Sequence, residues 1–495
     1  MKTTTRRQFL STSLAAGLTI ALPRWSKSAS ANEPVRIAIV GLGGLNIPGS
    51  VGGRGRQLIA VLRKIPEAKI VALCDVDRTI LEDSVEAFKK RGETVSAYTD
   101  VRKVLQEKSV DAVVIALPNH WHALATIWAC QAGKDVYVEK PFSHDLWEGR
   151  QMVAAATKYD RIVQVGTQNR SSTVLRQGFK LLHGGELGAI RYAHALVFRP
   201  REGIGRVSAP TPPPPSVDYD LWCGPTPLAP IQRKHLHYEW HWFWDTGNGE
   251  MGNNGIHVID QCRWGLQQNQ LPPRVLSLGG RFGALDTAET PNTQIAFFEY
   301  QPAPLICEVR NLRVPTSTQG IGKFRNATGG IVIDCEGGYL AGDGSGAALF
   351  EPSGRQIKEL PRPSKADDLE VAHMTNFLAA VRSRKASALA ADALQGHLSA
   401  ACCHMANVSY RLGKEAKPEA LQEAARADHG LLESFERCRE YLRDNGVDLG
   451  ATPAVLGPRL SMDAKREEFA GPLAAPANQL SRRQYREGFV VPALA

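Results

Sequence analysis

The glycine-rich stretch GLGGLNIPGSVGGRGRQL, residues 41–58, follows the apolar run VRIAIV and precedes the helix-like run LIAVLRKI. A dinucleotide-binding turn needs a glycine where the strand ends, a second where the pyrophosphate approaches the backbone, and a third where the helix packs on the strand. Gly41, Gly43 and Gly55 fill these places if residues 44–52 form a nine-residue insertion. The stretch therefore predicts a cofactor-binding turn, and a long loop without function is the alternative.

A carboxylate follows the glycines at a suitable distance. The strand-like run AKIVALCD ends in Asp75, 34 positions after Gly41, and subtracting the nine inserted residues leaves 25. The acid that binds the ribose hydroxyl of a dinucleotide usually stands about 20 residues on. A carboxylate at this place repels a 2′-phosphate, which favours NAD over NADP, although Arg78 nearby leaves NADP open.

A second stretch, HLHYEWHWFWDTGNG, concentrates imidazoles and aromatic rings. Its ten positions from 235 to 244 hold His235, His237, Tyr238, Trp240, His241, Trp242, Phe243 and Trp244. Aromatic faces stack on the apolar faces of sugars and imidazoles bind hydroxyls, so the stretch predicts part of a carbohydrate cleft. Most of these rings could equally be core aromatics. No spacing among the histidines repeats a zinc signature, so we expect no metal site.

The elements that must position these residues follow from the pattern of apolar runs. Short β-rich runs alternate with helical stretches from residue 35 to about 168. This alternation predicts a parallel sheet covered on both faces, and hence an α/β chain that begins with a Rossmann dinucleotide-binding domain at 32–168.

The remaining sequence has a different pattern, in which strands such as RVLSLGGRFG, TQIAFFEYQ and GGIVIDCEG are joined by turns. It predicts a second, α+β domain at 169–415 with a large, mainly antiparallel open sheet, and with helices within 371–412. The proline run APTPPPPS at 209–216 reads as a loop. Residues 416–495 predict a C-terminal helical and extended tail, in which the apolar FVVPAL docks on the rest of the chain.

Composition narrows the function classes. The chain has 495 residues, which predicts two or three domains. Its formal charge of +9 falls to +4 without the five basic residues that precede residue 32, so nucleic-acid binding is not expected. The nine cysteines are odd in number and irregularly spaced, which favours buried free thiols over a disulfide framework.

The N-terminal sequence predicts export. A twin-arginine pair, Arg6 and Arg7, precedes the short apolar segment LAAGLTIAL and the sequence ASA at 29–31. This is typical of a Tat signal peptide at 1–31, recognised by the Tat machinery and cleaved after Ala31. A membrane anchor would need about 18 uninterrupted apolar residues. We therefore expect a periplasmic or extracytoplasmic protein.

Several motifs together resemble one enzyme family. Besides GLG…GRG and Asp75, the sequence carries PNHWH at 118–122, EKP at 139–141, QVGTQNR at 164–170, DLWCGP at 220–225 and GNGEMGNNGIHVID at 247–260. Over nearly the whole mature chain it resembles the glucose-fructose oxidoreductase, inositol dehydrogenase and MocA-like (Gfo/Idh/MocA) family, and most closely its exported bacterial branch. The resemblance implies a homo-oligomer, a dimer or tetramer, commonly formed through the exposed face of the second sheet.

The resemblance also implies the catalytic residues. The family's catalytic group is the lysine of EKP and a downstream DxxxH, which correspond here to Lys140 and His257, while Asn253 stands at the aspartate position. In sugar oxidation His257 would take the hydroxyl proton and Lys140 would favour the developing alkoxide. Asn253 either binds a substrate hydroxyl or marks a displaced proton relay. Asp260 shares the helical face of His257, and it is either the partner of His257 or a structural residue.

Further contacts rest on the same resemblance. The cofactor-side residues it implies are Asn119, His122, Glu139, Gln168 and Trp222. The chemistry of the aromatic stretch, independently of the resemblance, gives Tyr238, His241 and Trp242 as the substrate-side candidates.

These observations predict an NAD(P)-dependent oxidoreductase that acts on a secondary hydroxyl of a sugar or sugar derivative. Export implies a tightly bound cofactor, loaded before export and regenerated in place, and the insertion at 44–52 could clamp it. Two alternatives remain open. One is a redox-neutral, NAD-dependent glycoside-cleaving enzyme, and the other is a sugar-binding relative without catalytic activity.

Overall fold

The computed structural model describes residues 33–44, 53–313, 322–360 and 368–495. The predicted signal peptide and most of the predicted insertion, residues 45–52, lie outside these ranges. None of the helices within the described residues has the length and apolar character needed to cross a membrane. All nine cysteines are buried and free, as their number and spacing predicted.

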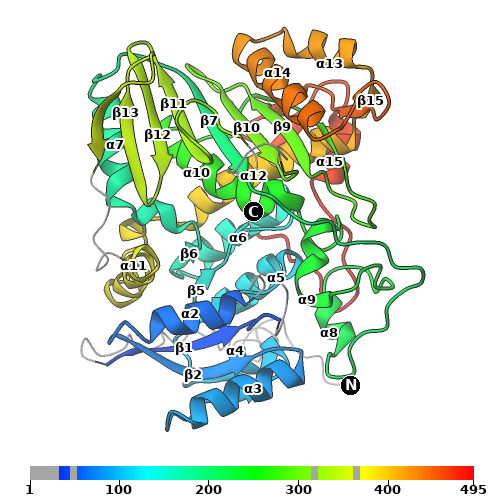
Figure 1. The fold of residues 1–495 in the computed structure, drawn as a ribbon. Helices are drawn as coiled ribbons and strands as arrows, with labels where there is room; N and C mark the ends of the chain where they lie inside the picture. The colour runs from blue at the N-terminus through cyan, green and yellow to red at the C-terminus, as the bar shows by residue number, and fades with distance from the viewer. Residues whose placement is uncertain (1–32, 45–52, 314–321, 361–367) are drawn as a thin grey trace, which may run out of the picture.

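A six-stranded parallel sheet forms the first layer of the molecule, in the lower half of Figure 1. Its strand order is β3-β2-β1-β4-β5-β6, with every neighbouring pair parallel. This is the doubly wound order of dinucleotide-binding domains, so the predicted Rossmann domain is confirmed. The strands are β1 Val35–Val40, β2 Ala68–Cys74, β3 Ser96–Tyr98, β4 Ala112–Ile115, β5 Asp135–Val138 and β6 Val163–Val165.

Helices cover both faces of this sheet. The helices α4 (Val101–Gln106), α5 (Asn119–Gln131) and α6 (Leu146–Lys158) pack on one face. On the other face lie α2 (Arg54–Leu62), α3 (Arg78–Lys89) and the much later α11 (Leu369–Ser383). The sequence pattern placed α11 in the second domain, whereas its side chains Met374, Phe377 and Leu378 are buried in the core of the first.

A 12-stranded sheet forms the second layer, with the order β14-β13-β12-β11-β7-β10-β9-β8-β16-β15; β17 also pairs with β8, and β18 pairs with β17. Only β7 and β10 pair in parallel among the described strands of this sheet, so the predicted mainly antiparallel sheet is confirmed. The strands are β7 Ile190–Phe198, β8 Arg274–Gly280, β9 Thr293–Phe298, β10 Leu305–Arg310, β11 Gly330–Cys335, β12 Gly338–Asp343, β13 Gly346–Phe350, β14 Gln356–Leu360, β15 Lys414–Ala416, β16 Ala454–Leu456, β17 Leu460–Asp463 and β18 Glu468–Ala470.

Each face of the second sheet also carries helices. Toward the first domain lie α7 (Thr173–His183), α10 (Ile256–Gly265) and α12 (Ala393–Arg411). On the opposite face, α13 (Pro418–Ala425) and α14 (His429–Asp444) form a separate apolar cluster with the strands. These two helices belong to the predicted C-terminal tail, residues 416–495. They cover part of the sheet face through which the resemblance implied oligomer contacts.

The segment between β7 and α10 leaves the second sheet and runs down beside the first domain (Figure 1). It contains the proline run as a loop and the short elements α8 (Tyr219–Cys223), α9 (Leu236–Glu239), the 3₁₀ turn η3 (Trp240–Trp242) and the π-helical turn η4 (Met251–Gly255). The C-terminal residues beyond α15 (Ala474–Leu480) pack on the same region. Phe489 and Val491 are buried there, as expected for FVVPAL.

Candidate active site

A cavity of about 400 Å³ opens where the carboxyl ends of the parallel strands face the second domain. Ligands of doubly wound sheets bind at this edge. The lining residues are Gly41, Gly43, Arg54, Gln57, Asp75, Val76, Ala116, Leu117, Pro118, Asn119, Glu139, Lys140, Gln168, Arg199, Arg201, Trp222, His237, Tyr238, Trp240, Asn253, Asn254 and His257.

The glycines of the predicted turn meet steric demands. Gly41 and Gly43 have φ angles of +86° and +84°, which side chains rarely adopt. A Cβ atom on Gly41 would lie 2.7 Å from the carbonyl oxygen of Ala116. At Gly55, which packs beneath the cavity, a Cβ atom would lie 1.9 Å from the carbonyl oxygen of Gly41. Close helix–strand packing therefore requires glycine at 55.

Asp75 braces this turn from the end of β2. Its carboxylate accepts hydrogen bonds from the backbone N–H groups of Leu42 (2.8 Å) and Asp77 (3.0 Å). Burial raises the pKa of Asp75 above its ordinary value. An apolar slot continues from Asp75 between Val76, Leu117 and Trp222.

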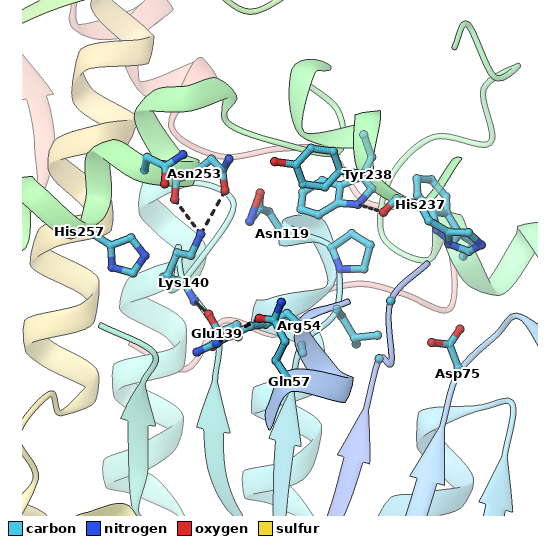
Figure 2. A pocket seen from close by; sticks show the side chains of 18 of the residues that line it. Arg54, Gln57, Asp75, Asn119, Glu139, Lys140, His237, Tyr238, Asn253 and His257 are labelled. Atoms are coloured by element: carbon cyan, nitrogen blue, oxygen red, sulfur yellow. Dashed lines mark hydrogen bonds and ion pairs between the residues drawn. The ribbon is translucent and has the colours of Figure 1, made fainter. Parts of the chain in front are cut away.

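Lys140 lies two residues beyond the end of β5 and points into the cavity (Figure 2). Its ammonium group donates to the main-chain oxygen of Asn253 at 2.7 Å and to the Asn253 side-chain oxygen at 3.1 Å. Burial lowers the pKa of Lys140 to about 8. The ammonium has three donors, so these two bonds leave one N–H for a ligand.

Beneath Asn253 lies Glu250, whose side chain is buried. Its carboxylate accepts hydrogen bonds from the side-chain amides of Asn253 (3.3 Å) and Asn254. It also pairs with Arg201 at 3.2 Å. Burial by itself would raise the pKa of Glu250, but the neighbouring Arg201 cation keeps it below the ordinary value.

His257 stands on α10, within the motif at 247–260 that we call the catalytic segment, and faces the same cavity. Its Nδ1 atom is buried without a hydrogen-bond partner among the described residues. Burial, followed by the Lys140 charge, lowers the pKa of His257 well below its ordinary value. The imidazole is therefore neutral near pH 7 and can accept a proton.

Asp260 does not partner His257. Its carboxylate binds Arg170 at 2.8 Å and accepts the hydroxyl hydrogen of Ser399 at 2.7 Å. It is 1% exposed, because it faces α12 in the interior and not the cavity. Of the two readings from the sequence, the structural role of Asp260 is therefore confirmed, and the partnership with His257 is wrong.

An ionic network closes the cofactor side of the cavity. Arg54, the first residue of α2, binds Glu139 at 2.6 Å and Glu370 at 2.7 Å. Gln168 donates to the same Glu370 at 3.1 Å. Burial by itself would raise the pKa of Glu139, but the Arg54 and Lys140 cations hold it below the ordinary value. No motif pointed to Glu370, which stands 316 positions from Arg54.

The aromatic stretch divides between cavity and interior. His237, Tyr238 and Trp240 line the cavity, and His237 binds Asp77 at 2.8 Å. His241 and Trp242, predicted on the substrate side, do not line it. His241 is bonded to the main-chain oxygen of Tyr238, and Trp242 packs with other apolar side chains, because consecutive residues of short helical turns face different sides.

His122 is a further predicted residue that does not line the cavity, as is Gly55. His122 is 1% exposed. Its ring nitrogens lie 2.7 Å from the main-chain oxygen of Pro141 and 2.8 Å from that of Leu117. His122 therefore braces the backbone that follows Lys140. The residues predicted for contacts with a cofactor that do line the cavity are Asn119, Glu139, Gln168 and Trp222.

Three cavity cations were missed from the sequence: Arg54, described above, and Arg199 and Arg201. Arg199 and Arg201 closely follow β7 and face the catalytic segment. The sequence signal that could have identified Arg199 and Arg201 is their position directly after a predicted strand. Arg199 approaches Asn254 at 3.4 Å, whereas Arg201 is paired with Glu250.

Within the described residues, one group combines side chains that could bind a metal: His144, Asp145 and Glu148. Asp145 caps α6 by accepting the backbone N–H of Glu148 at 2.8 Å, and Glu148 accepts that of His144. Arg483 lies 3.6 Å from Glu148. These bonds cap the N-terminus of α6 and anchor the C-terminal residues.

Comparison with known proteins places this architecture in one family. Residues 35–167 match the model of an oxidoreductase family with an NAD-binding Rossmann fold, and residues 203–290 match its C-terminal alpha/beta domain. The myo-inositol 2-dehydrogenase of Thermotoga maritima is 28% identical over 185 residues, which cover 37% of this chain and 48% of the relative. A glycosyl hydrolase family 109 protein of Shewanella pealeana is 28% identical over 223 residues, 40% of this chain and 48% of the relative.

The chain thus spans about half the length of these curated relatives. Among solved structures, the WlbA dehydrogenase of Bordetella pertussis, in complex with NADH and UDP-GlcNAcA, has a TM-score of 0.52 at 20% identity, covering 75% of this chain and 95% of its own. At this identity the likeness concerns the fold alone. With both domain models matched in order over the described architecture, the chain belongs to the Gfo/Idh/MocA family of oxidoreductases.

Proposed function

We propose that the chain oxidises a secondary hydroxyl of a sugar or sugar derivative with a tightly bound NAD(P). The observation that carries this proposal is the meeting of Lys140, Asn253 and His257 in a single cavity with the glycine turn. A charged donor and a neutral base stand there beside a site shaped for a dinucleotide. This combination suits removal of a hydroxyl proton during oxidation.

The residues present fit a dinucleotide. The steric cradle of Gly41 and Gly55 leaves room only for glycine, and α2 starts from Gly53 without a side-chain cap. Its N-terminus can therefore receive a pyrophosphate. Asp75 can accept a ribose hydroxyl, and the apolar slot beside Trp222 suits a flat base. When bound, the nicotinamide supplies a carbon that accepts hydride from the substrate.

Lys140 and His257 divide the proton chemistry. Lys140 is charged near pH 7 and donates its remaining N–H to the substrate oxygen, which favours the developing alkoxide. His257 is neutral and takes the hydroxyl proton. Asn253 orients Lys140 through two hydrogen bonds. The cavity aromatics Tyr238 and Trp240 support a sugar, because their faces can stack on its apolar side.

Asp75 favours NAD over NADP, since a buried acid disfavours a nearby phosphate. Tight binding is supported by contacts that tie cavity residues to distant segments, namely Arg54 to Glu370 and His237 to Asp77. We expect dissociation of the nucleotide to require these contacts to open.

Identification of the nucleotide tests the proposal directly. The protein is purified without added cofactor, denatured to release any bound nucleotide, and analysed by mass spectrometry. The refilled protein is then screened against sugars, sugar acids and cyclitols by absorbance at the NADH wavelength. We expect NAD(H) and its reduction by at least one secondary alcohol, whereas absence of dinucleotide binding would refute the proposal.

A redox-neutral reaction is the second candidate, and the glycosyl hydrolase family 109 relatives favour it. In that case the hydride returns to the sugar and a glycosidic bond is cleaved. Release of a chromogenic aglycone without net NADH distinguishes it from oxidation. A bound nucleotide that no sugar reduces, in a protein that turns over no glycoside, would indicate a sugar-binding relative without activity.

Export and assembly are further parts of the proposal. Replacing Arg6 and Arg7 by lysine should retain the precursor inside the cell, as cell fractionation would show.

We also propose a homo-oligomer. Because α13 and α14 already cover part of the second sheet, the free area lies toward its β14 edge, where Ile357 is 46% exposed. Light scattering would give the oligomeric state, and Ile357→Glu should shift it toward monomer.

A further inference from the structure

Asn253 cannot itself carry the negative charge that an aspartate would bring to this position. The structure places a carboxylate directly behind it. Glu250 lies three residues earlier, at the start of the π-helical turn η4, and is 1% exposed. π-Helical turns occur often at functional sites because they redirect side chains locally.

The contacts of Glu250 fix the orientation of the Asn253 amide. The amide nitrogen donates to Glu250 at 3.3 Å, and the amide oxygen accepts from the Lys140 ammonium at 3.1 Å. The reverse orientation would place N–H groups against the ammonium donors and an oxygen against the carboxylate. Glu250 thus turns Asn253 into an acceptor for Lys140.

The surrounding charges show what Glu250 balances. The charged groups around Lys140 are Glu139 and Arg54 from the first domain, and Glu250 and Arg201 from the second. The groups around Glu250 are Arg201, His241 and the amides of Asn253 and Asn254. Tyr238 also lies close to both Arg201 and Glu250. Of the two acids, Glu139 has the larger effect on the pKa of Lys140, but its charge is paired with Arg54 at 2.6 Å. Glu250 is the acid that faces Lys140 from the catalytic segment.

We propose that Glu250 is a positioning residue that supplies the negative charge of the catalytic group, with the Asn253 amide linking it to Lys140. The carboxylate that the family has at the position of Asn253 is thus provided by Glu250 in this chain. This inference rests on the proposed function, because it concerns the same Lys140 that acts on the substrate. It also makes predictions that do not require turnover.

Glu250→Gln tests the charge while conserving shape. Loss of the negative charge should lower the pKa of Lys140, since a nearby anion favours the ammonium form, by roughly 0.5 to 1 unit. The alkaline limb of the kcat/KM profile should move to lower pH by the same amount, and the acidic limb should stay. Glu250→Asp keeps the charge and should retain the wild-type limb.

A double variant, Glu250→Gln with Asn253→Asp, returns the acid to position 253. If Glu250 supplies the charge, the alkaline limb of this variant should lie above that of Glu250→Gln and return at least to the wild-type position, because a carboxylate at position 253 stands next to the Lys140 ammonium. If Glu250 is only structural, Glu250→Gln should leave the limb at the wild-type position. Where Glu250→Gln alone fails to fold, Asn253→Asp in the wild-type background is the reference: removing the Glu250 charge from it should lower the limb by roughly 0.5 unit, and an unchanged limb would overturn the proposal.

The pKa of Lys140 can be measured without substrate. Competitive labelling with acetic anhydride across a pH series, followed by peptide mass spectrometry, reports its titration in the protein as purified. Glu308→Gln is the matched control, because Glu308 is equally buried and pairs with Arg310 at 2.7 Å and with Arg437, away from the cavity. It should lower stability and leave the titration of Lys140 unchanged.

The outcomes separate the two proposals. A downward shift of Lys140 titration in Glu250→Gln, restored in the double variant, supports the role of Glu250. An unchanged titration overturns it, even if the wild-type enzyme is active. Failure of every substrate to reduce NAD removes the proposed function but leaves the labelling result to decide whether Glu250 controls Lys140.

Discussion

Lys140 is protonated and His257 is unprotonated near pH 7, although both line the same cavity. Burial lowers both pKa values, but Lys140 starts from 10.5 and reaches about 8, whereas His257 starts from 6.5 and falls well below it. The lysine therefore stays charged near pH 7 while the histidine is neutral. A base and an electrostatic donor can coexist over the pH range between these two values.

The pH dependence of catalysis follows from these directions. Activity needs charged Lys140, so kcat/KM should fall above about pH 8 as the ammonium loses its proton. Below that, it should stay level until His257 gains a proton at a pH well under 6.5. Lys140→Arg keeps a permanent charge and should remove the alkaline limb, at reduced activity. A limb that persists in this variant would show that another group titrates there.

Replacement of His257 should lower kcat more than replacement of Asn253. His257→Ala removes the proton acceptor and should lower kcat about 100-fold or more. Asn253→Ala removes one of two hydrogen bonds to Lys140, because its main-chain oxygen remains, and should cost about tenfold. Steady-state kinetics at constant pH, with circular dichroism as the folding control, measures both. Equal losses would contradict this ranking.

Among the elements, the C-terminal residues stabilise the segment that carries Trp222. Arg486 donates to the main-chain oxygen of Gly224 at 2.8 Å, and the ring of Phe489 packs edge-on against Trp121. Trp121 in turn donates to the main-chain oxygen of Trp222 at 3.0 Å. A chain of contacts therefore leads from the C-terminal residues to the wall of the cofactor cavity.

Phe489→Ala should lower both the stability of the protein and its affinity for the nucleotide. Removal of the buried ring should lower the free energy of unfolding by up to about 3 kcal/mol and raise the nucleotide Kd about tenfold. The neighbouring Val490 is 55% exposed, so Val490→Ala is the matched control and should change neither quantity. Thermal unfolding and titration calorimetry measure them. Unchanged nucleotide affinity in Phe489→Ala would exclude the coupling.

In the molecule as a whole, the first domain is completed by a helix from far along the chain. α11 buries Met374 and Phe377 against the face that α2 and α3 share, and the Phe377 ring contacts that of Tyr137. It also carries Glu370, which binds Arg54 at the cofactor cavity. Folding of the first domain and completion of its site are therefore linked to the rest of the chain.

A fragment of residues 33–168 tests this dependence. Without α11 it exposes the apolar face around Tyr137, so it should bind a hydrophobic dye, unfold without a sharp transition and associate in solution. The chain from residue 33 to 495 serves as the control and should unfold cooperatively. Dye fluorescence and size-exclusion chromatography distinguish the two. A monomeric, cooperatively unfolding fragment would show that α11 is dispensable.

Features that depend on local spacing are evident from the amino-acid sequence alone. The glycine turn, Asp75 at the end of β2, and Lys140 at the end of β5 follow from strand and helix periodicity, because a strand end brings its next residue to the same edge of a parallel sheet. The change from alternating elements to turn-linked strands likewise predicted two different sheets. These patterns repeat over neighbouring residues and need no knowledge of distant contacts.

The pairing of side chains, in contrast, depends on tertiary packing. Only tertiary packing sets Glu370 of α11 against Arg54, turns Asp260 toward Arg170, and buries His122 under the EKP strand end. These partners stand 90 to 316 positions apart, except for His122 and Pro141 at 19. Likewise, the acid behind Asn253 became evident only when η4 placed Glu250 against its amide. Charge and hydrogen bonding act through space, so their pairings depend on the completed fold.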